Sequence, residues 1–170
     1  QIEAGLRFIE LIAGGSRVDE ASLKIMEDLY KTDVSGKEIA LIKSFVLIEQ
    51  IRFPGKFQAA YEIAEEIHQC KMLKIIIQPI IENAIKHGIG KKNGPGEIIV
   101  TGEKEGDLLR FRVVDNGIGL DSCDNRIDEL PHTIVRSGYG LKNVDERIKL
   151  EYGSQYGIDF HSERGKGTTV

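Results

Sequence analysis

An aspartate follows an apolar run in the segment VVDNGIGLD, residues 113–121. A strand that buries the two valines carries Asp115 toward the interior, where a carboxylate needs a hydrogen-bond donor. The exocyclic amine of a purine would supply that donor, and Gly117 and Gly119 would let the backbone approach a flat ring. A glycine turn that simply ends the strand is the alternative, and the segment alone leaves both open.

A second group of polar residues lies in the strongly apolar segment QPIIENAIKHG, residues 78–88. Asn83 is three residues from Lys86 and four from His87, so a helix places all three on one face. Glu82 neighbours Asn83 and can pair with Lys86. An amide oxygen is a suitable ligand for magnesium, which also binds phosphate oxygens. The alternative is an exposed helix face that carries one Glu–Lys ion pair.

A third segment, SGYGLKNVDERI, contains two glycines just before an expected helix. Gly138 and Gly140 precede a helix that should begin near Leu141, and Lys142 is close by. Free amides at a helix start attract phosphate, and a nearby lysine strengthens that attraction. No strand immediately precedes the glycines and the P-loop spacing is absent, so neither a Rossmann unit nor a P-loop is indicated.

A fourth segment, GKGTTV, occupies residues 165–170. The hydroxyl groups of Thr168 and Thr169 could complete the floor of a base pocket at the start of a strand. This segment has almost no specificity by itself, and a plain strand is the alternative.

The composition is that of a globular protein, with 29% charged and 41% hydrophobic residues in a chain of 170. This length suits one domain with an appendage. A net charge of −4 without a long basic cluster argues against a nucleic-acid partner. Cys70 and Cys123 are far apart and are expected to be free thiols rather than zinc ligands. Neither a membrane span nor a signal peptide is visible.

The elements that position these segments divide the chain at residue 57. Residues 1–57 are expected to form an amphipathic helical arm, and residues 58–170 a two-layer sandwich of helices and mostly antiparallel strands. The expected elements are helices at 2–12, 19–30 and 37–53, a strand from 57, a buried helix at 72–85 in which Pro79 kinks the helix or marks an irregular first turn, strands at 97–104 and 108–115, a loop at 121–137, a helix at 140–152, and strands at 156–162 and from 165.

The four segments, in this order, resemble the nucleotide-binding boxes of the GHKL (Bergerat-fold) ATPase superfamily. That superfamily includes gyrase B, MutL, the ninety-kilodalton heat-shock chaperone and the sensor histidine kinases. The segments QPIIENAIKHG and GYGLKNVDERIKLEYG are similar to those of the LytS-type sensor histidine kinases. The resemblance covers residues 58–170, and the segment IMEDLYKTDVSGKEIALIKSFVLIEQIRFPGKF resembles the linker of the same family.

The resemblance implies an α+β fold, a mixed, mostly antiparallel sheet covered by helices and preceded by the helical arm. It implies the ATP-binding catalytic region of a two-component sensor histidine kinase, which transfers the γ-phosphoryl of Mg-ATP to a histidine and then to the receiver domain of a response regulator. It also implies a homodimer formed through the N-terminal helices and a cytoplasmic domain that reaches the membrane only through segments outside this chain.

Individual roles follow from the same resemblance. Asn83 would bind Mg²⁺, Glu82 would orient water or the nucleophile, and Lys86 and His87 would face the phosphates. Asp115 would accept the adenine amine. The implied ATP-binding residues are Asn83, Asp115, Gly117, Gly119, Gly138, Gly140, Leu141, Lys142, Thr168 and Thr169.

Residues 121–137 would form a lid over the nucleotide, from which Arg136 could reach the γ-phosphate. The four histidines of the chain are His68, His87, His132 and His161, and none lies within residues 1–57, where the phosphoacceptor would be expected. We therefore expect a fragment whose acceptor histidine lay upstream, or a protein that has lost it.

Two other hypotheses stay open. The first is a GHKL-type ATPase that couples ATP hydrolysis to conformational change, with Glu82 as the general base that activates water. The second is a helical scaffold whose nucleotide site has decayed.

Overall fold

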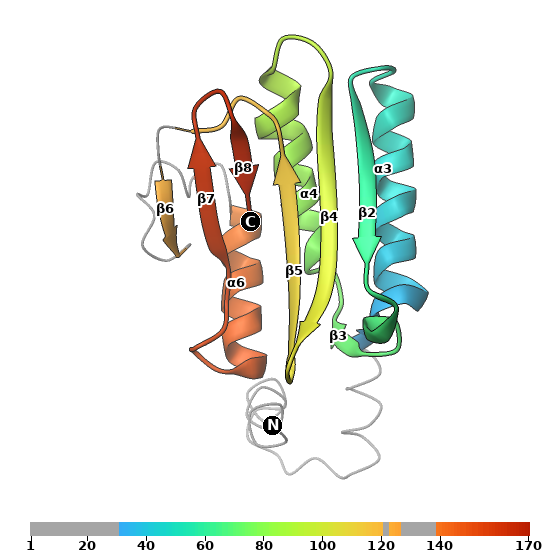
Figure 1. Ribbon diagram of the computed structural model, residues 1–170, viewed down its shortest axis with the longest axis vertical. Helices are drawn as coiled ribbons and strands as arrows, with labels where there is room; N and C mark the ends of the chain where they lie inside the picture. Colours follow the sequence, from blue (N-terminus) through green and yellow to red (C-terminus); the bar gives the residue numbers. More distant parts are fainter. Residues whose placement is uncertain (1–30, 121–122, 127–138) are drawn as a thin grey trace.

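The computed structural model describes residues 31–120, 123–126 and 139–170. A six-stranded mixed sheet forms one layer, and helices cover one of its faces (Figure 1). The covering helices are α3 (Ala40–Arg52), α4 (Ile77–Asn83) and α6 (Tyr139–Tyr152). This arrangement confirms the expected α+β fold with two layers.

The strand order of the sheet is β2-β4-β5-β8-β7-β6. The strands are β2 (Phe57–Ile63), β4 (Gly96–Glu105), β5 (Leu108–Asp115), β6 (Cys123–Arg126), β7 (Asp159–Glu163) and β8 (Gly167–Thr169). Only β2 and β4 pair in parallel, and the other neighbours are antiparallel. Because β8 is inserted between β5 and β7, the end of the described chain pairs with the middle of the sheet.

The core lies between the sheet and the helical layer. Along β4, Ile98 and Val100 are buried while Ile99 is only half-buried, as the alternation of a strand requires. Val113 of β5 belongs to the same hydrophobic core as Ile81 of α4. The apolar face of the sheet therefore fixes α4 directly behind the carboxyl end of β5.

The segment that precedes the sheet also packs into this core. β1 (Lys31–Asp33) pairs antiparallel with β3 (Lys71–Leu73), and the π-helical turn η1 (Val34–Ile39) leads into α3. β1 lies between the helices expected at 19–30 and 37–53, where no helix was predicted, and its pairing with β3 holds it as a strand. Residues of η1 and α3 share the main core, and these are Val34, Ile39, Ile42 and Val46. The proposed boundary at residue 57 stays a prediction, and residues 1–30, which include two expected helices, lie outside the described residues.

The apolar segment 72–85 is not one helix. Its first residues belong to β3, where they pair with β1 as a strand. The helix α4 therefore begins only at Ile77. Pro79 consequently lies in the first turn of α4, where a missing N–H removes no helical hydrogen bond. The helix continues as the π-helical turn η3 (Ala84–Gly88) and the 3₁₀ turn η4 (Ile89–Lys91).

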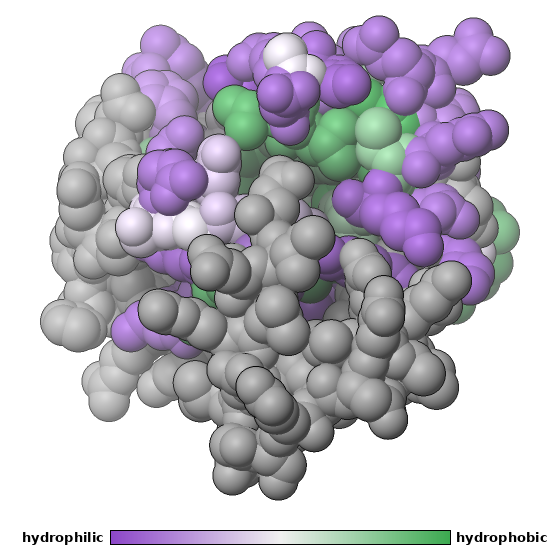
Figure 2. Space-filling model, turned by 90° about the horizontal axis from the view of Figure 1, so that it is seen from below, coloured by the Kyte–Doolittle hydropathy of each residue, from purple (hydrophilic) through white to green (hydrophobic). Residues whose placement is uncertain are grey.

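The other elements expected within the described residues are present with shifted bounds. The helix expected from residue 140 begins one residue earlier, at Tyr139, and the loop expected at 121–137 contains β6. A further 3₁₀ turn, η2 (Glu65–Ile67), follows β2. In the view from below, hydrophilic residues border a hydrophobic area in the upper part of the described surface (Figure 2). Across the described ranges, no helix has the length and apolar character needed to cross a bilayer.

Candidate functional site

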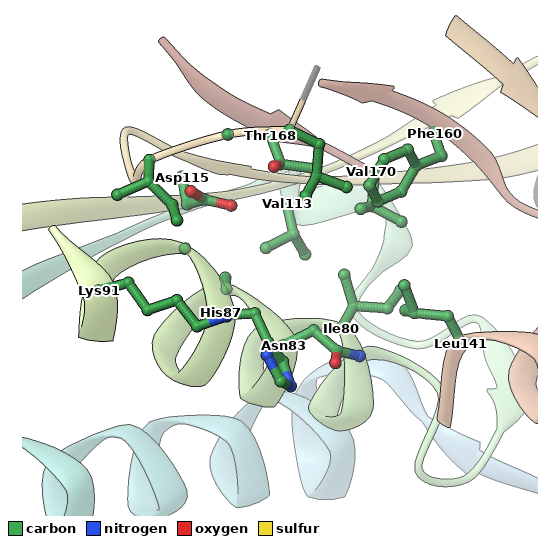
Figure 3. A pocket seen from close by; sticks show the side chains of 15 residues that line it. Ile80, Asn83, His87, Lys91, Val113, Asp115, Leu141, Phe160, Thr168 and Val170 are labelled. Carbon is green, nitrogen blue, oxygen red and sulfur yellow. The ribbon is translucent and has the colours of Figure 1, made fainter. Parts of the chain in front are cut away.

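A pocket lies between the sheet and the helix that α4 and η3 form together (Figure 3). The side chains of Asp115 and Thr168 lie on its sheet side, and those of Asn83 and His87 lie on its helix side (Figure 3). Leu141 from the first turn of α6 closes one end. Three of the four segments singled out in the sequence thus meet around one cavity, and Leu141 adds the fourth.

Asp115 is the last residue of β5 and is only 5% exposed. Its Oδ1 atom accepts a hydrogen bond of 2.8 Å from the backbone N–H of Gly117. Burial raises the pKa of this carboxyl to about 6, although the backbone amides of Gly117 and Thr168 and the positive charge of Lys92 counter part of that increase. The carboxylate is therefore held at an energetic cost in the wall of a pocket.

The turn and the ligand interpretations of Asp115 are compatible in this geometry. A carboxylate has about four lone-pair sites on its two oxygens, so the backbone amides of Gly117 and Thr168 leave acceptor capacity. Asp115 is also one of the lining residues, so its carboxylate borders the pocket (Figure 3). A ligand with an N–H donor would satisfy a group that is otherwise poorly solvated.

The glycines around Asp115 permit close backbone packing. A Cβ on Gly88 would lie 2.5 Å from Oδ1 of Asp115, and a Cβ on Gly117 would lie 2.3 Å from the carbonyl carbon of Gly88. Gly119 has φ +60°, and a Cβ there would meet the carbonyl oxygen of Glu163 at 2.0 Å. Gly119 lines the pocket, whereas Gly117 does not line it and packs closely against the backbone of Gly88 in η3.

Asn83, at the end of α4, points a carboxamide toward the pocket. Its Nδ2 atom donates to the carbonyl oxygen of Pro79 at 2.8 Å. Because that carbonyl can only accept, the amide orientation is fixed and the Oδ1 atom faces away from Pro79. Among the described residues, no hydrogen bond to this oxygen is present. A hard oxygen donor that is oriented and unpaired fits Mg²⁺, with water and phosphate oxygens as its other ligands.

Two basic residues of the pocket come from η3 and η4. His87 and Lys91 both line the pocket. Partial desolvation, followed by the charges of Lys91 and Lys86, lowers the pKa of His87 below its usual value. This shift favours the neutral imidazole of His87, while Lys91 supplies positive charge to the pocket lining.

Glu82 and Lys86 lie outside the pocket lining. They form an ion pair of 2.9 Å on the outer side of the helix, and Glu82 also accepts from Gln78 at 3.1 Å. The hydrogen bond from Lys86 is the main cause of the lowered pKa of Glu82. The widened π-helical turn at 84–88 follows Asn83, so the α-helical spacing that placed Lys86 beside Asn83 does not hold here.

The last strand brings one of its two threonines to the site. Thr168 pairs with Asp115 across β5 and β8 and lines the pocket. Its hydroxyl is 2.9 Å from the hydroxyl of Ser162, which also accepts from the N–H of Leu120. Thr169 is paired with Val114 and does not line the pocket, because successive strand residues face opposite sides.

The glycine-rich segment before α6 is only partly described. Gly140 lies within the first turn of α6, and a Cβ there would be 3.5 Å from the Cβ of Pro79. Lys142 is exposed and lies 4.0 Å from Glu146. Gly138 and Arg136 lie outside the described residues, as do the other parts of the expected lid except β6.

Some lining residues were not anticipated. They are apolar and come from several elements, namely Ile80, Ala84, Val113, Ile118, Leu120, Phe160 and Val170. Each lies in a segment that the sequence predicts as strand, helix or connecting loop, but only the pairing of β7 and β8 beside β5 brings Phe160 and Val170 to the cavity. The pocket thus combines an apolar lining with a few polar groups, as small-molecule sites do.

The chain belongs to the histidine kinase-, DNA gyrase B- and HSP90-like ATPase family, whose model matches residues 69–170. Sensor histidine kinase YpdA of Escherichia coli (strain K12) is 35% identical over 147 residues, which are 85% of this chain and 25% of the relative. Sensor histidine kinase YesM of Bacillus subtilis (strain 168) is 32% identical and covers 79% of this chain and 22% of the relative. The chain thus spans about a quarter of the length of these relatives.

Solved structures share the fold. The catalytic domain of histidine kinase ThkA superposes with a TM-score of 0.55 at 18% identity, covering 82% of this chain and 89% of that one. Acinetobacter baumannii histidine kinase AdeS also gives a TM-score of 0.55, at 14% identity, covering 99% of this chain and 91% of the other. These likenesses agree with the family match on the architecture.

Proposed function

We propose that this chain is the ATP-binding catalytic region of a two-component sensor histidine kinase. One observation carries the proposal: Asp115 and Asn83 line the same pocket from opposite walls, one at the sheet and one at the helix (Figure 3). The family match and the relatives named as sensor histidine kinases support it.

In this proposal, each wall of the pocket has a separate task. Asp115 accepts the exocyclic amine of adenine, and Phe160 and Val113 contact the base within the apolar part of the pocket. Lys91 attracts the phosphates, and Oδ1 of Asn83 holds Mg²⁺. The metal ion supplies charge neutralisation for the phosphate groups. The protein contributes positioning and electrostatic stabilisation, which dominate phosphoryl transfer.

The phosphoryl acceptor in this proposal is a histidine of the full protein. Its imidazole nitrogen attacks the γ-phosphorus while the bond to the bridging oxygen breaks and ADP leaves. The phosphoryl group then passes to a response regulator. One structural relative, histidine kinase ThkA, has been solved in complex with response regulator protein TrrA, which supports a partner of that class.

We propose a homodimer as the assembly of the N-terminal region. The outer face of α3 exposes large apolar residues that no described segment covers: Leu47 is 57% exposed, Ile48 56% and Ile51 69%. A second copy of the chain would bury this face. Light scattering should give a dimer mass for the wild type and a monomer mass for Ile51→Glu. Leu150→Glu, on α6 and 57% exposed, is the control that should stay dimeric; a monomeric wild type would contradict the proposal.

Nucleotide titration tests the site. A fluorescent ATP analogue should bind the wild-type chain, and Asp115→Asn should weaken binding by about tenfold or more, as loss of a charged hydrogen bond predicts. Asn83→Ala should weaken binding in magnesium but not in EDTA. The matched controls are Asp107→Asn, at the opposite end of β5, and Asn93→Ala, in an exposed loop. Unimpaired binding by both site variants would refute the assignment.

Hydrolysis by the isolated chain would indicate an ATPase that drives conformational change. The position of Glu82 gives that function less support, since its carboxylate is paired with Lys86 and Gln78 and its pKa is lowered. A general base at neutral pH benefits from a raised pKa. Steady turnover of ATP that Glu82→Gln abolishes would favour the ATPase, and negligible turnover favours the kinase.

A further inference from the structure

The turn between β3 and α4, residues 74–76, has an unusual backbone. Ile75 has φ +56°, and it is the one described residue other than glycine with a positive φ. A β-branched residue rarely adopts this left-handed conformation. Its side chain is 49% exposed, so burial of the side chain does not account for the conformation. The surrounding contacts must therefore hold the backbone in place.

Glu38 of η1 makes the first set of these contacts. This residue is only 1% exposed. Its Oε2 atom accepts from the N–H of Ile75 at 2.9 Å, and its Oε1 atom accepts from the N–H groups of Ile76 at 3.0 Å and Ile77 at 3.3 Å. These amides lie before or at the first residue of α4, where no helical carbonyl is available to them. A buried carboxylate from another element thus caps α4.

Arg147 of α6 makes the second set of contacts, from the opposite direction. Its guanidinium donates to the carbonyl oxygen of Lys74 at 2.7 Å and to that of Ile75 at 3.2 Å. The same turn is therefore held through its amides by Glu38 and through its carbonyls by Arg147. Glu38 connects the turn to the arm segment. Arg147 connects it to α6, the helix that also carries Leu141 of the pocket.

We propose that Glu38 and Arg147 are positioning residues that fix α4 through the 74–76 turn and thereby place Asn83 in the pocket. Only about 9 Å of helix separates Ile77 from Asn83, at about 1.5 Å per residue, so a displaced helix start displaces the amide oxygen. A shift of η1 and α3 would reach the nucleotide site by this route. The inference rests on the proposed nucleotide-binding function for its ligand and identifies the contact through which the arm acts on it.

The test compares nucleotide affinity with and without magnesium in the full 170-residue chain. Glu38→Gln replaces one acceptor oxygen with a donor, and Glu49→Gln is the matched control, because Glu49 is also a buried glutamate of the arm, at 5% exposure, but pairs with Arg52. We expect Glu38→Gln to reduce the gain in affinity due to magnesium about fivefold or more while changing the magnesium-free affinity by less than about twofold. A folded Glu38→Gln chain with the wild-type magnesium gain would overturn the proposal.

Two further measurements keep the result clear. If Glu38→Gln does not fold, Arg147→Lys serves instead, since it keeps the charge but loses the second hydrogen bond; it should reduce the magnesium gain in the same direction, and an unchanged gain would count against the proposal. The second measurement, hydrogen exchange of the Ile76 and Ile77 amides, can be made without nucleotide. Faster exchange in Glu38→Gln with Val144 of α6 unchanged supports the contact even if the wild type binds no nucleotide, a result that would refute only the proposed function; unchanged exchange refutes the contact.

Discussion

The Cα of Gly88 lies so close to the carboxylate of Asp115 that a Cβ would be 2.5 Å from Oδ1. This contact joins the end of the site helix to the end of a central strand. The carboxylate also lines the pocket. The carboxylate of Asp115 can occupy this position because Gly88, which faces it, has no side chain.

The first prediction concerns the Gly88 contact. Gly88→Ala should destabilise the chain by about 1–3 kcal/mol, because the added methyl group forces a backbone or a strand end to move. Gly140→Ala is the matched control, since Gly140 lies in a helix and a Cβ there makes only ordinary contacts, with the Cβ of Pro79 at 3.5 Å and Nδ2 of Asn83 at 4.0 Å. It should be neutral or stabilise by up to about 1 kcal/mol. Urea unfolding measures both, and equal stability of the two variants would contradict the packing argument.

The second prediction concerns the stability of the chain as a function of pH. The pKa of Asp115 is raised to about 6 in the folded state, whereas an unfolded aspartate has a pKa of about 3.9. Protonation therefore favours the folded chain, and this contribution of about 3 kcal/mol is present below about pH 4 and is lost as the pH rises through 6. The unfolding free energy of the wild type relative to Asp115→Asn should fall between pH 4.5 and 7.5. A difference that is independent of pH would show that the carboxyl is not perturbed.

The third prediction concerns nucleotide affinity as a function of pH. Protonation of Asp115 removes the acceptor that the adenine amine needs, so affinity should fall by up to about tenfold per pH unit below about 6. The nucleotide phosphates also titrate in this range, so the quantity to measure is the ratio of the wild-type affinity to that of Asp115→Asn. This ratio should decline as the pH falls, and a constant ratio would place the ligand away from Asp115.

The fourth prediction uses the two adjacent threonines of β8. Thr168→Val removes a hydroxyl from the pocket and breaks the 2.9 Å contact with Ser162, so nucleotide affinity should fall about fivefold, which corresponds to one hydrogen bond. Thr169→Val keeps the pocket intact, because Thr169 does not line it. Titration of both variants gives the answer. An equal loss in the two would mean that strand stability, rather than the pocket hydroxyl, is responsible.

The fifth prediction concerns the buried acid of α6. Asp145 is 2% exposed, accepts from the N–H of Ile158 at 2.8 Å and pairs with Lys149 at 2.7 Å. Asp145→Ala removes the acceptor of the buried Ile158 N–H and one of the partners of Lys149, and should cost about 1–3 kcal/mol. Glu146→Ala, on the exposed side of the same helix, should change stability by less than about 0.5 kcal/mol. Thermal unfolding that ranks the two variants equally would contradict the buried-pair argument.

Much of the sheet was predictable because its signals are local. The hairpin of β4 and β5 follows from alternating apolar residues on either side of a short turn, and the predicted bounds differ little from the observed ones. The apolar segment 72–85 was misinterpreted because its first residues become a strand only through pairing with β1, some forty residues earlier. A run of isoleucines reads equally well as strand or helix until that partner is known.

The chemistry of the site was easier to predict than its geometry. The residue types of Asp115 and Asn83 indicate their possible ligands from the sequence alone. Strand register decides that Thr168 rather than Thr169 lines the pocket. Lys86 lies outside the pocket lining because of a π-helical turn that no sequence pattern predicts. Phe160 reaches the pocket only through the order of β7 and β8 in the sheet. Such facts belong to the tertiary structure.

The insertion of β8 between β5 and β7 has a consequence for biosynthesis. Val113 and Val170 exchange two backbone hydrogen bonds, of 2.9 and 3.0 Å, although 57 positions separate them. Because β8 follows both β5 and β7 in the sequence, a nascent chain carries β5 with an unsatisfied edge until synthesis has passed Thr168. Because Thr168 also lines the pocket, the edge of β5 becomes paired and the sheet side of the pocket forms in the same step of synthesis.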